Sequence, residues 1–539
     1  MLQKLKVVIF VTLLLILVTS LVGCATPTAA PQAPATEQPA ASATKETAKT
    51  EAPATAPAKK KVFVFGRYMD AITPDPVMND ANADLWYLQQ YYSGLMRFTA
   101  DNKVEPDLAD RVEVSKDGLT WTYYLKPNLV FSDGTPITPE DWVWSLKRAA
   151  DPNNGIWWFT FDAMKDVTAD AEKVVFTLKE PYTPFEYTPA MFNAVVMPKA
   201  KVEAAGGWEK FMEKPIGAGP FILKEWKRGE YMDLIKNPNY WDAANVTMDE
   251  IMIKTIVDDN ARILALQAGE VDAINYPPFN RVADLKADPN LQILTFPSTF
   301  TTYITLNNRE APLNDVRVRQ ALSYAIDRQA LIDSVNFGVG TPAKGFRAPG
   351  TLYYNDQLVG WPLDVEKAKS LLAEAGYPNG FNLTMEIVTG REMHQQIATL
   401  VKDMWAKIGV NLTIVPLESG LYNDHYYNNQ FQVHINGWTD DIPDPSEGVS
   451  YAMVYKTSQC FHTGWHSDEV DKMAADALKL PNGHEREAIY KQLQQIFNDN
   501  VPFIPLYHEP YLIIARNNVK NFVQTPLGSY IWRNIEVTK

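Results

Sequence analysis

Short strand-like runs alternate with longer helix-like runs through most of this chain, from residue 61 towards its C-terminus. In the longer runs apolar residues recur every three or four positions, which is the spacing of one face of an α-helix. We expect helices at residues 261–267, 316–334, 364–375, 394–408 and 485–497. This alternation, without an internal repeat, is typical of an α/β fold. Because 539 residues are too many for one hydrophobic core, we expect two or three domains.

The N-terminus carries the pattern of an export signal. Two lysines precede an apolar run at residues 7–18, which has the length of a secretory signal rather than of a membrane span. The next residues, LVGC at 21–24, resemble the lipobox of bacterial lipoproteins, in which the chain is cut before the cysteine and the cysteine is acylated. We therefore expect residues 1–23 to be removed as a signal peptide and Cys24 to be the lipid anchor. The alternative is an ordinary signal peptide with an incidental cysteine.

Residues 24–60 are rich in Ala, Pro and Thr and contain no aromatic residue. Such a segment cannot bury enough apolar surface to fold, so we expect a tether between the anchor and a body that begins near residue 61. Cys460 is then the single cysteine of the body. The body therefore cannot form an internal disulfide and must be stabilised by core packing.

Composition and motifs argue against several functions. The chain has 64 acidic and 50 basic residues, a net charge of -14, which argues against a nucleic acid as partner. It contains no Gly-x-Ser-x-Gly, His-Glu-x-x-His or Gly-Lys-Ser/Thr motif, so we expect neither an enzyme nor a cofactor. His462 and His466 are four residues apart, but Thr463 and Gly464 between them disfavour a helix, so we expect no metal site.

The most distinctive stretch is WTDDIPDP at residues 438–445, the acidic motif. The preceding run, residues 431–438, alternates apolar and polar residues like a strand, and Pro443 and Pro445 stop that strand. Three carboxylates are therefore held at a strand end. From these residues alone, a ligand site and a solvated acidic loop are both open.

Two further local structures are predicted in the first third of the body. Residues 119–125 alternate like a strand between two Asp-Gly turn signals. A helix then begins at Thr138, with Thr138 as its cap, Pro139 in the first position and Asp141 completing a capping box.

A series of sequence motifs follows in a fixed order along the body. They lie at residues 104–109, 119–125, 131–136, 140–143, 215–221, 237–241, 265–272, 313–322, 325–328, 368–376 and 438–445. No single motif is decisive, but the ordered series resembles the family 5 extracellular solute-binding proteins, the oligopeptide- and dipeptide-binding type that serve ABC importers. The resemblance covers residues 61–539.

This resemblance implies a fold, a periplasmic-binding-protein type II clam with two large α/β lobes and a small inserted domain. Lobe I is expected to combine residues 61–100, 198–302 and 506–539, and the small inserted domain to comprise residues 101–197. Lobe II is expected at residues 303–505. Two linkers between the large lobes would act as a hinge, and closure would bury the ligand.

The resemblance also implies a function. The chain would be a lipid-anchored receptor on the outer face of the cytoplasmic membrane, at the cell surface or in the periplasm. It would act as a monomer, capture peptides or other oligomeric solutes between its lobes and deliver them to an ABC permease with its ATPase. The alternatives are an oligosaccharide receptor of the same family, a secreted hydrolase that uses paired carboxylates such as Asp441 and Asp444, and a surface adhesin or sensor.

For the acidic motif, the resemblance assigns separate roles to neighbouring residues. Asp441 would take the α-ammonium of a peptide, with Trp438 at the wall of the site. Neighbouring strands would pair with the peptide backbone by β-augmentation. Asp444 is expected to be a turn or capping residue, and Asp440 a charge at the rim of the site.

Other ligand contacts are implied outside the motif. The loop of Tyr68, Met69 and Asp70 would supply the second strand edge. Trp158 falls where relatives place an aromatic residue on the ligand, although packing in the core is an equally open role. His394 resembles a histidine that approaches the ligand's carboxylate.

One departure from the family pattern concerns Ile435. Oligopeptide binders place an arginine three residues before the motif's tryptophan, where it meets the peptide carboxylate, and this chain has Ile435 there. The far end of a peptide would then meet water or His394, or the ligand is not a peptide. A sugar oligomer is the alternative that the 14 tryptophans and 25 tyrosines would suit.

Overall fold

The computed structural model describes residues 60–79 and 82–538. The predicted signal peptide, Cys24 and residues 25–59 of the predicted tether lie outside the described residues. Within residues 60–79 and 82–538, no helix has both the length and the apolar character needed to cross a membrane.

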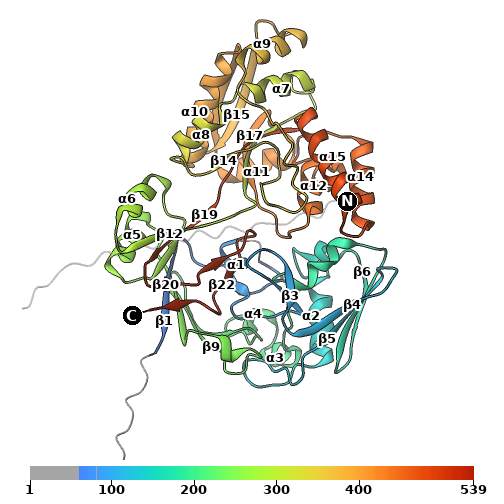
Figure 1. Ribbon diagram of the computed structural model, residues 1–539, viewed down its shortest axis with the longest axis vertical. Helices are drawn as coiled ribbons and strands as arrows, with labels where there is room; N and C mark the ends of the chain where they lie inside the picture. Colours follow the sequence, from blue (N-terminus) through green and yellow to red (C-terminus); the bar gives the residue numbers. More distant parts are fainter. Residues whose placement is uncertain (1–59, 80–81, 539) are drawn as a thin grey trace, which may run out of the picture. The chain divides into compact units, whose positions relative to one another are not determined.

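The largest sheet combines segments from the start, the middle and the end of the chain (Figure 1). Its strands are β1 (Val62–Arg67), β8 (Phe221–Lys227), β9 (Tyr231–Lys236), β10 (Glu250–Thr255), β11 (Ala273–Asn275), β12 (Leu291–Phe296) and β19 (Tyr511–Arg516). Their order is β12-β19-β11-β1-β10-β9-β8, and β1 pairs in parallel with both β10 and β11. Phe63 and Phe65 of β1 are fully buried and contact the ring of Trp532, so residues near the C-terminus complete this core.

A second sheet contains the strand that leads into the acidic motif. Its strands are β13 (Thr301–Leu306), β14 (Thr341–Pro342), β15 (Phe381–Val388), β16 (Val410–Leu417), β17 (Val433–Trp438) and β18 (Phe503–His508). Their order is β14-β18-β13-β17-β15-β16. The predicted strand before the motif is thus confirmed as β17. It pairs antiparallel with the fully buried β13, which places Trp438 opposite Thr301 at the strand end.

A third sheet has four strands. It lies beside the helix that we expected to begin at Thr138. Its strands are β4 (Ala109–Val114), β5 (Thr120–Leu125), β6 (Met164–Ala169) and β7 (Lys173–Leu178), in the order β4-β5-β7-β6. β5 confirms the strand predicted at residues 119–125. The capping box at the next helix is also confirmed: Thr138 accepts a hydrogen bond from the backbone N–H of Asp141 (3.2 Å), and the Asp141 carboxylate accepts one from that of Thr138 (2.9 Å).

Short strands form three further pairs. They are β2 (Met96–Phe98) with β3 (Val104–Pro106), β20 (Val519–Lys520) with β23 (Glu536–Val537), and β21 (Val523–Gln524) with β22 (Tyr530–Ile531). The last two pairs carry the C-terminal segment across the core of the first sheet. The β21–β22 pair thereby brings Gln524 and Tyr530 close to β11, because Asn275 donates a hydrogen bond to the Tyr530 hydroxyl (3.2 Å).

Helices cover these sheets and connect their strands. The α-helices are α1 (Asn82–Leu88), α2 (Pro139–Ala149), α3 (Lys199–Ala205), α4 (Trp208–Phe211), α5 (Asp259–Ala268), α6 (Val282–Ala287), α7 (Val316–Tyr324), α8 (Arg328–Val335), α9 (Val365–Glu374), α10 (Glu392–Ala406), α11 (Ser419–Tyr427), α12 (Pro445–Met453), α13 (Tyr455–Ser458), α14 (Asp468–Lys479) and α15 (His484–Asn500). The 3₁₀ segments are η1 (Trp158–Phe161), η2 (Thr183–Glu186), η3 (Thr188–Ala190), η4 (Ala243–Asn245) and η5 (Phe279–Arg281).

Four of the five predicted helices are confirmed as α5, α9, α10 and α15, within a few residues at each end. The fifth, a single helix at residues 316–334, is wrong, because the chain breaks there into α7 and α8. The physical cause is Asp327, whose carboxylate accepts a hydrogen bond from the backbone N–H of Ala330 (3.0 Å) and caps a new helix.

The chain crosses between the first and second sheets at two neighbouring linkers. Residues 297–300 join β12 to β13, and residues 509–510 join β18 to β19. The Ser298 hydroxyl donates a hydrogen bond to the backbone carbonyl of Glu509, so the two linkers contact each other. The expected lobe boundaries at 302/303 and 505/506 fall inside β13 and β18, and we propose to place them in these linkers instead.

The Gly-Ala-Gly run at residues 217–219 has a packing role. A Cβ atom on Gly217 would lie 1.9 Å from the Tyr91 carbonyl oxygen, and one on Gly219 would lie 2.6 Å from the Tyr91 carbonyl carbon. Only glycine allows this close approach between the two backbones. The run thus holds the segment after α1 against the entry to β8.

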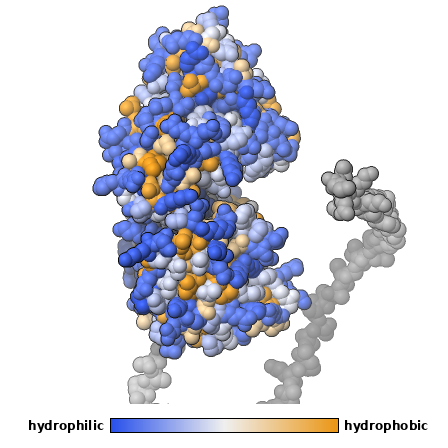
Figure 2. All heavy atoms as spheres, turned by 90° about the vertical axis from the view of Figure 1, so that its right-hand side faces the viewer, coloured by the Kyte–Doolittle hydropathy of each residue, from blue (hydrophilic) through white to orange (hydrophobic). Residues whose placement is uncertain are grey.

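The face of the molecule shown in Figure 2 is mainly hydrophilic, with hydrophobic residues in small separate groups. Such a surface is normal for a water-exposed protein, since scattered apolar side chains need no special explanation.

Candidate functional site

The acidic motif forms a loop between β17 and α12 in the second sheet's lobe. β17 ends at Trp438 and α12 begins at Pro445, as the two prolines predict. Ile442 in the middle of the loop packs against the hydrophobic cores that contain β1 and the four-stranded sheet. The loop thus belongs to one lobe and contacts the others.

Asp440 is not the rim charge that we expected from the sequence, because it is buried and paired. Its Oδ2 lies 2.7 Å from Nη1 of Arg347, and its Oδ1 accepts a hydrogen bond from the Trp438 indole (2.9 Å). Both charged side chains are almost fully buried. A Cβ atom on Gly448 would lie 2.7 Å from Arg347 Nη1, so a glycine at the start of α12 leaves the room that this ion pair needs.

Asp444 is the cap that we expected, and it is also half of a second buried ion pair. Its Oδ1 accepts a hydrogen bond from the backbone N–H of Ser446 at the start of α12 (2.9 Å). Both carboxylate oxygens also accept hydrogen bonds from Arg486 of α15, at 2.8 and 2.7 Å. The two side chains are completely buried, so the pair fixes the end of the loop to α15.

Asp441 lacks such a cation and lies beside a second unpaired carboxyl group, that of Glu447. Within residues 60–79 and 82–538, neither side chain forms an ion pair with a lysine, arginine or histidine. Glu447 Oε2 accepts hydrogen bonds from the backbone N–H groups of Asp441 (2.7 Å) and Ile442 (3.0 Å). Burial and the nearby Asp440 raise the pKa of Asp441 to about 7, and burial and Asp441 raise the pKa of Glu447 well above its usual range.

The small cavity beside Asp441 is formed mainly by the opposite lobe. It has a volume of about 10 Å³, and the other residues that line it are Leu85, Trp86, Gln89, Phe98, Phe192, Leu527 and Ser529. Contacts nearby hold the two sides together, since Lys479 pairs with Glu180 (2.6 Å) and Thr183 donates to the Leu480 carbonyl (2.6 Å). Asp441 is therefore half-buried at the contact between the lobes.

A much larger cavity, which we call the aromatic cavity, lies on the other side of Trp86. Its volume is about 300 Å³, and its walls include the side chains of Trp86, Tyr276, Phe279, Phe300, Tyr511 and Tyr530. The Trp86 and Tyr276 rings are parallel with centroids 6.2 Å apart, and Tyr511 meets Trp86 edge-on at 5.2 Å. Thr439 of the acidic motif and Glu509 of the second linker also line this cavity. Trp86 thus borders both cavities.

The indole of Trp438 lies on the lobe II side of the acidic motif. Its ring contacts those of Tyr451 (4.5 Å between centroids) and Phe461 (5.2 Å), and its N–H bonds to Asp440. In this arrangement Trp438 supports the buried ion pair of Asp440. Its role at the wall of a ligand site stays a prediction.

The loop of Tyr68, Met69 and Asp70 follows β1. The Tyr68 ring contacts that of Tyr276 at 4.5 Å, which places Tyr68 directly behind the wall of the aromatic cavity. Met69 is half-buried. Asp70 faces away, because its carboxylate pairs with Arg67 and accepts hydrogen bonds from the β8–β9 hairpin.

Trp158 and His394 lie apart from both cavities. Trp158 begins η1 and is 37% exposed, whereas its neighbour Trp157 packs edge-on against Phe192, which lines the small cavity. His394 is buried in lobe II near Arg391, and burial together with Arg391 lowers its pKa to about 4. The structure therefore does not bring these two residues together with Asp441.

Ile435 occupies the position of the arginine expected in oligopeptide binders and is buried in the core of lobe II. Its backbone N–H and carbonyl both bond to the hydroxyl of Tyr422 (3.1 and 2.6 Å). A side chain here points into packed apolar residues. An arginine at this position would therefore have no room in the present packing.

Metal-ligating residues do not converge in the part of the chain that the structure describes, where no group of three His, Cys, Asp or Glu side chains could hold a metal ion. His466 lies 3.3 Å from Asp468 and from Asp471, whereas His462 contacts the ring of Tyr426. The two histidines thus have different partners.

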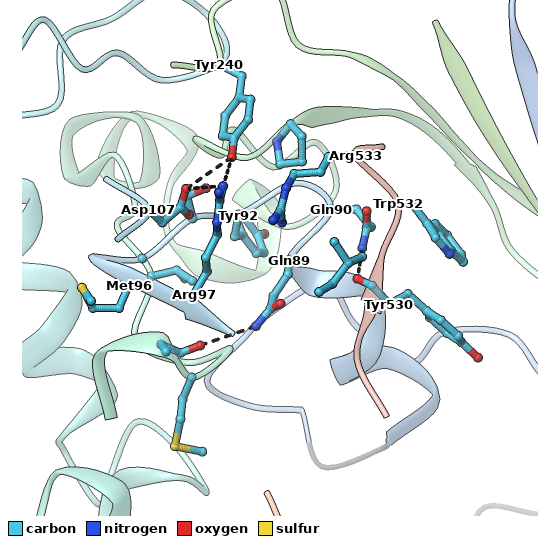
Figure 3. Close-up of a pocket in the computed structure, with 17 residues that line it drawn as sticks. Gln89, Gln90, Tyr92, Met96, Arg97, Asp107, Tyr240, Tyr530, Trp532 and Arg533 are labelled. Carbon is cyan, nitrogen blue, oxygen red and sulfur yellow. Dashed lines mark hydrogen bonds and ion pairs between the residues drawn. The ribbon is translucent and has the colours of Figure 1, made fainter. Parts of the chain in front are cut away.

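A third pocket, shown in Figure 3, is a polar junction with its charges already paired. Its volume is about 30 Å³, roughly that of one water molecule in the liquid. Arg97 donates hydrogen bonds to Glu105 (2.8 Å) and to the Tyr240 hydroxyl (3.0 Å), and Arg533 lies 3.3 Å from Glu105. This pocket joins the chain near Arg97 to the C-terminal segment and leaves no free charge for a solute.

Several residues of the site were not found from the sequence. They are Arg347, Glu447, Glu509, Trp86, Tyr276 and Tyr511. Only Glu447 carried a local signal, because Asp444 and Glu447 have the spacing of a capping box at a helix start. The others come from distant segments and have no common pattern.

Comparison with known proteins gives the following relatives. Residues 103–458 match the family described as bacterial extracellular solute-binding proteins, family 5, middle region. Heme-binding protein A of Haemophilus influenzae is 32% identical over 469 residues, which cover 82% of this chain and 85% of that protein. The glutathione-binding protein GsiB of Escherichia coli O1:K1 / APEC is 28% identical over 481 residues, covering 86% of this chain and 92% of that protein.

Solved structures that are similar to this chain include further binding proteins. HbpA2 from Haemophilus parasuis superimposes with a TM-score of 0.81 at 30% identity, over 89% of this chain and 100% of that chain. The periplasmic binding protein DppA from Helicobacter pylori, in complex with the peptide STSA, gives a TM-score of 0.75 at 25% identity, over 89% and 98%.

The buried pair of Asp444 and Arg486 predicts a large loss of stability on substitution. Asp444→Ala leaves a buried guanidinium without its partner, which we expect to lower the free energy of unfolding by about 3–5 kcal/mol. Urea unfolding followed by circular dichroism measures this. Asp315→Ala is the matched control, because Asp315 also caps a helix and pairs with an arginine, Arg317, but is partly exposed. It should cost about 1 kcal/mol, and equal losses in the two variants would contradict our account of burial.

The raised pKa of Asp441 predicts a pH dependence of stability. An aspartate in the unfolded chain has a pKa near 3.9. Between about pH 4 and pH 7 the folded state therefore binds the proton more tightly, and stability falls as the pH rises through this window. Asp441→Asn removes this titration, so the ligand-free variant should be more stable than the native chain at pH 8, by about 4 kcal/mol, and similar to it at pH 4.

Thermal unfolding of the ligand-free protein at pH 4, 6 and 8 measures this difference. Asp403→Asn is the control, since Asp403 is exposed on α10 and should leave the pH profile unchanged. Parallel pH profiles for the native chain and Asp441→Asn would show that Asp441 does not carry the effect.

Proposed function

This chain belongs to the bacterial extracellular solute-binding proteins of family 5, and on that premise we propose that it captures peptides with a free amino group for an ABC permease and its ATPase. Its fold is the expected type II periplasmic-binding fold, and its relatives bind solutes rather than catalyse reactions. The observation that carries the proposal is the half-buried carboxyl pair of Asp441 and Glu447, which has no cation of its own among the described residues.

The charges of the acidic motif favour a cationic ligand group. Arg347 neutralises Asp440 and Arg486 neutralises Asp444, so Asp441 and Glu447 are left over. A buried carboxylate is costly unless a cation or several hydrogen-bond donors satisfy it. An α-ammonium group supplies one positive charge and three donors and would let Asp441 ionise when the lobes close around the ligand.

The names of the relatives suggest several solutes, and the negative charge of the site favours those that carry an ammonium group. Haem carries two carboxylates and no ammonium group, so the unpaired acidic residues disfavour it. Glutathione is a tripeptide and carries an α-ammonium group beside its two carboxylates. The peptide of the DppA complex belongs to the class that carries an amino terminus. The missing arginine at Ile435 further favours a ligand whose far end needs no buried cation from lobe II.

An oligosaccharide receptor is the second candidate, and the aromatic cavity favours it. Sugar rings stack on aromatic faces, and Trp86, Tyr276 and Tyr511 offer such faces. A neutral sugar, however, would leave both unpaired carboxyl groups without a positive charge. We therefore place the peptide first.

We further propose that the protein is a lipoprotein on the outer face of the cytoplasmic membrane. The support is the LVGC motif at residues 21–24 and the tether that follows it. The acyl chains on the thiol and on the new amino group of Cys24 would hold the protein at the membrane, since each buried CH₂ contributes about 0.8 kcal/mol. The tether would let the receptor reach the permease.

Peptide capture predicts a binding defect in Asp441→Ala. We expect at least tenfold weaker binding of a tripeptide such as trialanine, because the ligand's ammonium loses its ionised partner. Isothermal titration calorimetry with the full chain in mild detergent measures the affinity. Glu485→Gln, which removes an exposed carboxylate elsewhere, should bind as the native chain does.

Acetylation of the peptide's amino group tests the same contact from the ligand side, and it should weaken binding to the native chain by a similar factor. Unchanged peptide affinity in Asp441→Ala would refute the peptide assignment. If oligosaccharides but not peptides raise the melting temperature of the native chain, the second candidate replaces it.

Lipid anchoring predicts a change of location in Cys24→Ser. The native chain should incorporate labelled palmitate and sediment with membranes even at high salt, whereas Cys24→Ser should do neither. Cys460→Ser is the matched control, because Cys460 is buried in the body and should not affect the label. Palmitate incorporation by Cys24→Ser would contradict the assignment of Cys24.

A further inference from the structure

The described polar side chains that line the aromatic cavity carry no positive charge. Its polar side chains include Glu509, Asn275 and Gln524, and none of the described residues that line it is a lysine, arginine or histidine. Asn275 uses its amide N–H to bond Tyr530 (3.2 Å), and Gln524 uses its own to bond the Gly528 carbonyl (3.0 Å). The side-chain oxygens of both amides are buried and have no hydrogen-bond donor. Both residues are only 3% exposed.

Glu509 adds a carboxyl group to these two oxygens. It lies in the linker between β18 and β19, and its one side-chain hydrogen bond comes from the amide of Asn336 (2.9 Å). A carboxylate can accept about four hydrogen bonds, so most of its capacity is unused. No ion pair of Glu509 is present among the described residues, and burial raises its pKa to about 7.

Arg262, behind the wall of the cavity, does not neutralise Glu509. Arg262 lies behind Tyr276, but its guanidinium already bonds to Asp259 (2.6 Å) and to the backbone carbonyl of Tyr276 (2.9 Å). The cavity therefore combines aromatic walls with two buried amide oxygens that have no donor and with the half-buried carboxyl group of Glu509. Aromatic faces and a carboxylate both attract cations, and a buried acceptor left without a donor costs stability.

We propose that the aromatic cavity receives a basic side chain of the bound peptide, a lysine ammonium or an arginine guanidinium, and that Glu509 determines this preference. The inference rests on the proposed function and deepens it, since it concerns a second part of the same ligand. Asp441 would hold the amino terminus of the peptide on one side of Trp86. Glu509, Asn275 and Gln524 would hold its basic side chain on the other.

The size and place of the cavity agree with this assignment. A volume of about 300 Å³ is about ten times that of one water molecule in the liquid, so a long side chain has room. Because Glu509 is part of a linker between the lobes, a cation bound there contacts the segment about which the lobes would close. A peptide without a basic side chain would leave the acceptors unsatisfied on closure.

A matched peptide series tests the inference. We would titrate the full chain in mild detergent with trialanine derivatives that carry lysine, its uncharged analogue norleucine, or glutamate at each position in turn. At one position lysine should bind at least tenfold more tightly than norleucine, and glutamate should bind most weakly. Equal affinities for lysine and norleucine at every position of the native chain would overturn the inference.

Substitution of Glu509 assigns the preference to this residue. In Glu509→Gln, which keeps the shape of the side chain, the ratio of lysine affinity to norleucine affinity should fall below about threefold. Glu485→Gln should retain the full advantage, and thermal unfolding checks that each variant is folded. A full lysine advantage in Glu509→Gln would overturn the role of Glu509. Failure of every peptide, trialanine included, to bind the native chain would instead contradict the proposed function.

Discussion

A carboxylate buried in a protein needs a cation or hydrogen-bond donors, and the acidic motif meets this need in two different ways. Asp440 and Asp444 are neutralised by arginines of their own lobe, Arg347 and Arg486, and these pairs fix the loop between β17 and α12. Asp441 and its neighbour Glu447 have no such partner. The two satisfied pairs hold the unsatisfied one in place, so the stability of the loop and its capacity to bind come from adjacent residues of one short sequence.

The sequence predicted those parts of the fold that depend on local patterns. The capping box at Thr138, the strand before the motif and the helices near residues 261, 364, 394 and 485 were all found, because caps and periodicity act within a few residues. The break between α7 and α8 was missed although Asp327 carried it, since the apolar spacing continues across it. Apolar spacing alone does not show whether a residue such as Asp327 continues a helix or caps a new one.

Burial was the quantity that local patterns could not supply. Asp440, Asp441 and Asp444 are the same residue type, so the sequence alone does not distinguish their roles. The role of Asp440 was misjudged because its partner Arg347 lies 93 positions away in the chain. The aromatic cavity was missed for the same reason. Its walls come from α1, the segment after β11, the two linkers and the C-terminal hairpin, which only the sheet order brings together.

The two linkers have a consequence for the chain as a whole. Residues 301–508 leave the first sheet's lobe at Ser298 and return at Glu509, and these two residues are hydrogen-bonded. Lobe II therefore begins and ends at the same point in space, like an insertion into a loop of its host. Such a segment can be removed or exchanged between homologues without stretching the remaining chain. The architecture thus permits modular replacement of the part that carries the acidic motif, while the lobe that contains β1 and β19 is retained.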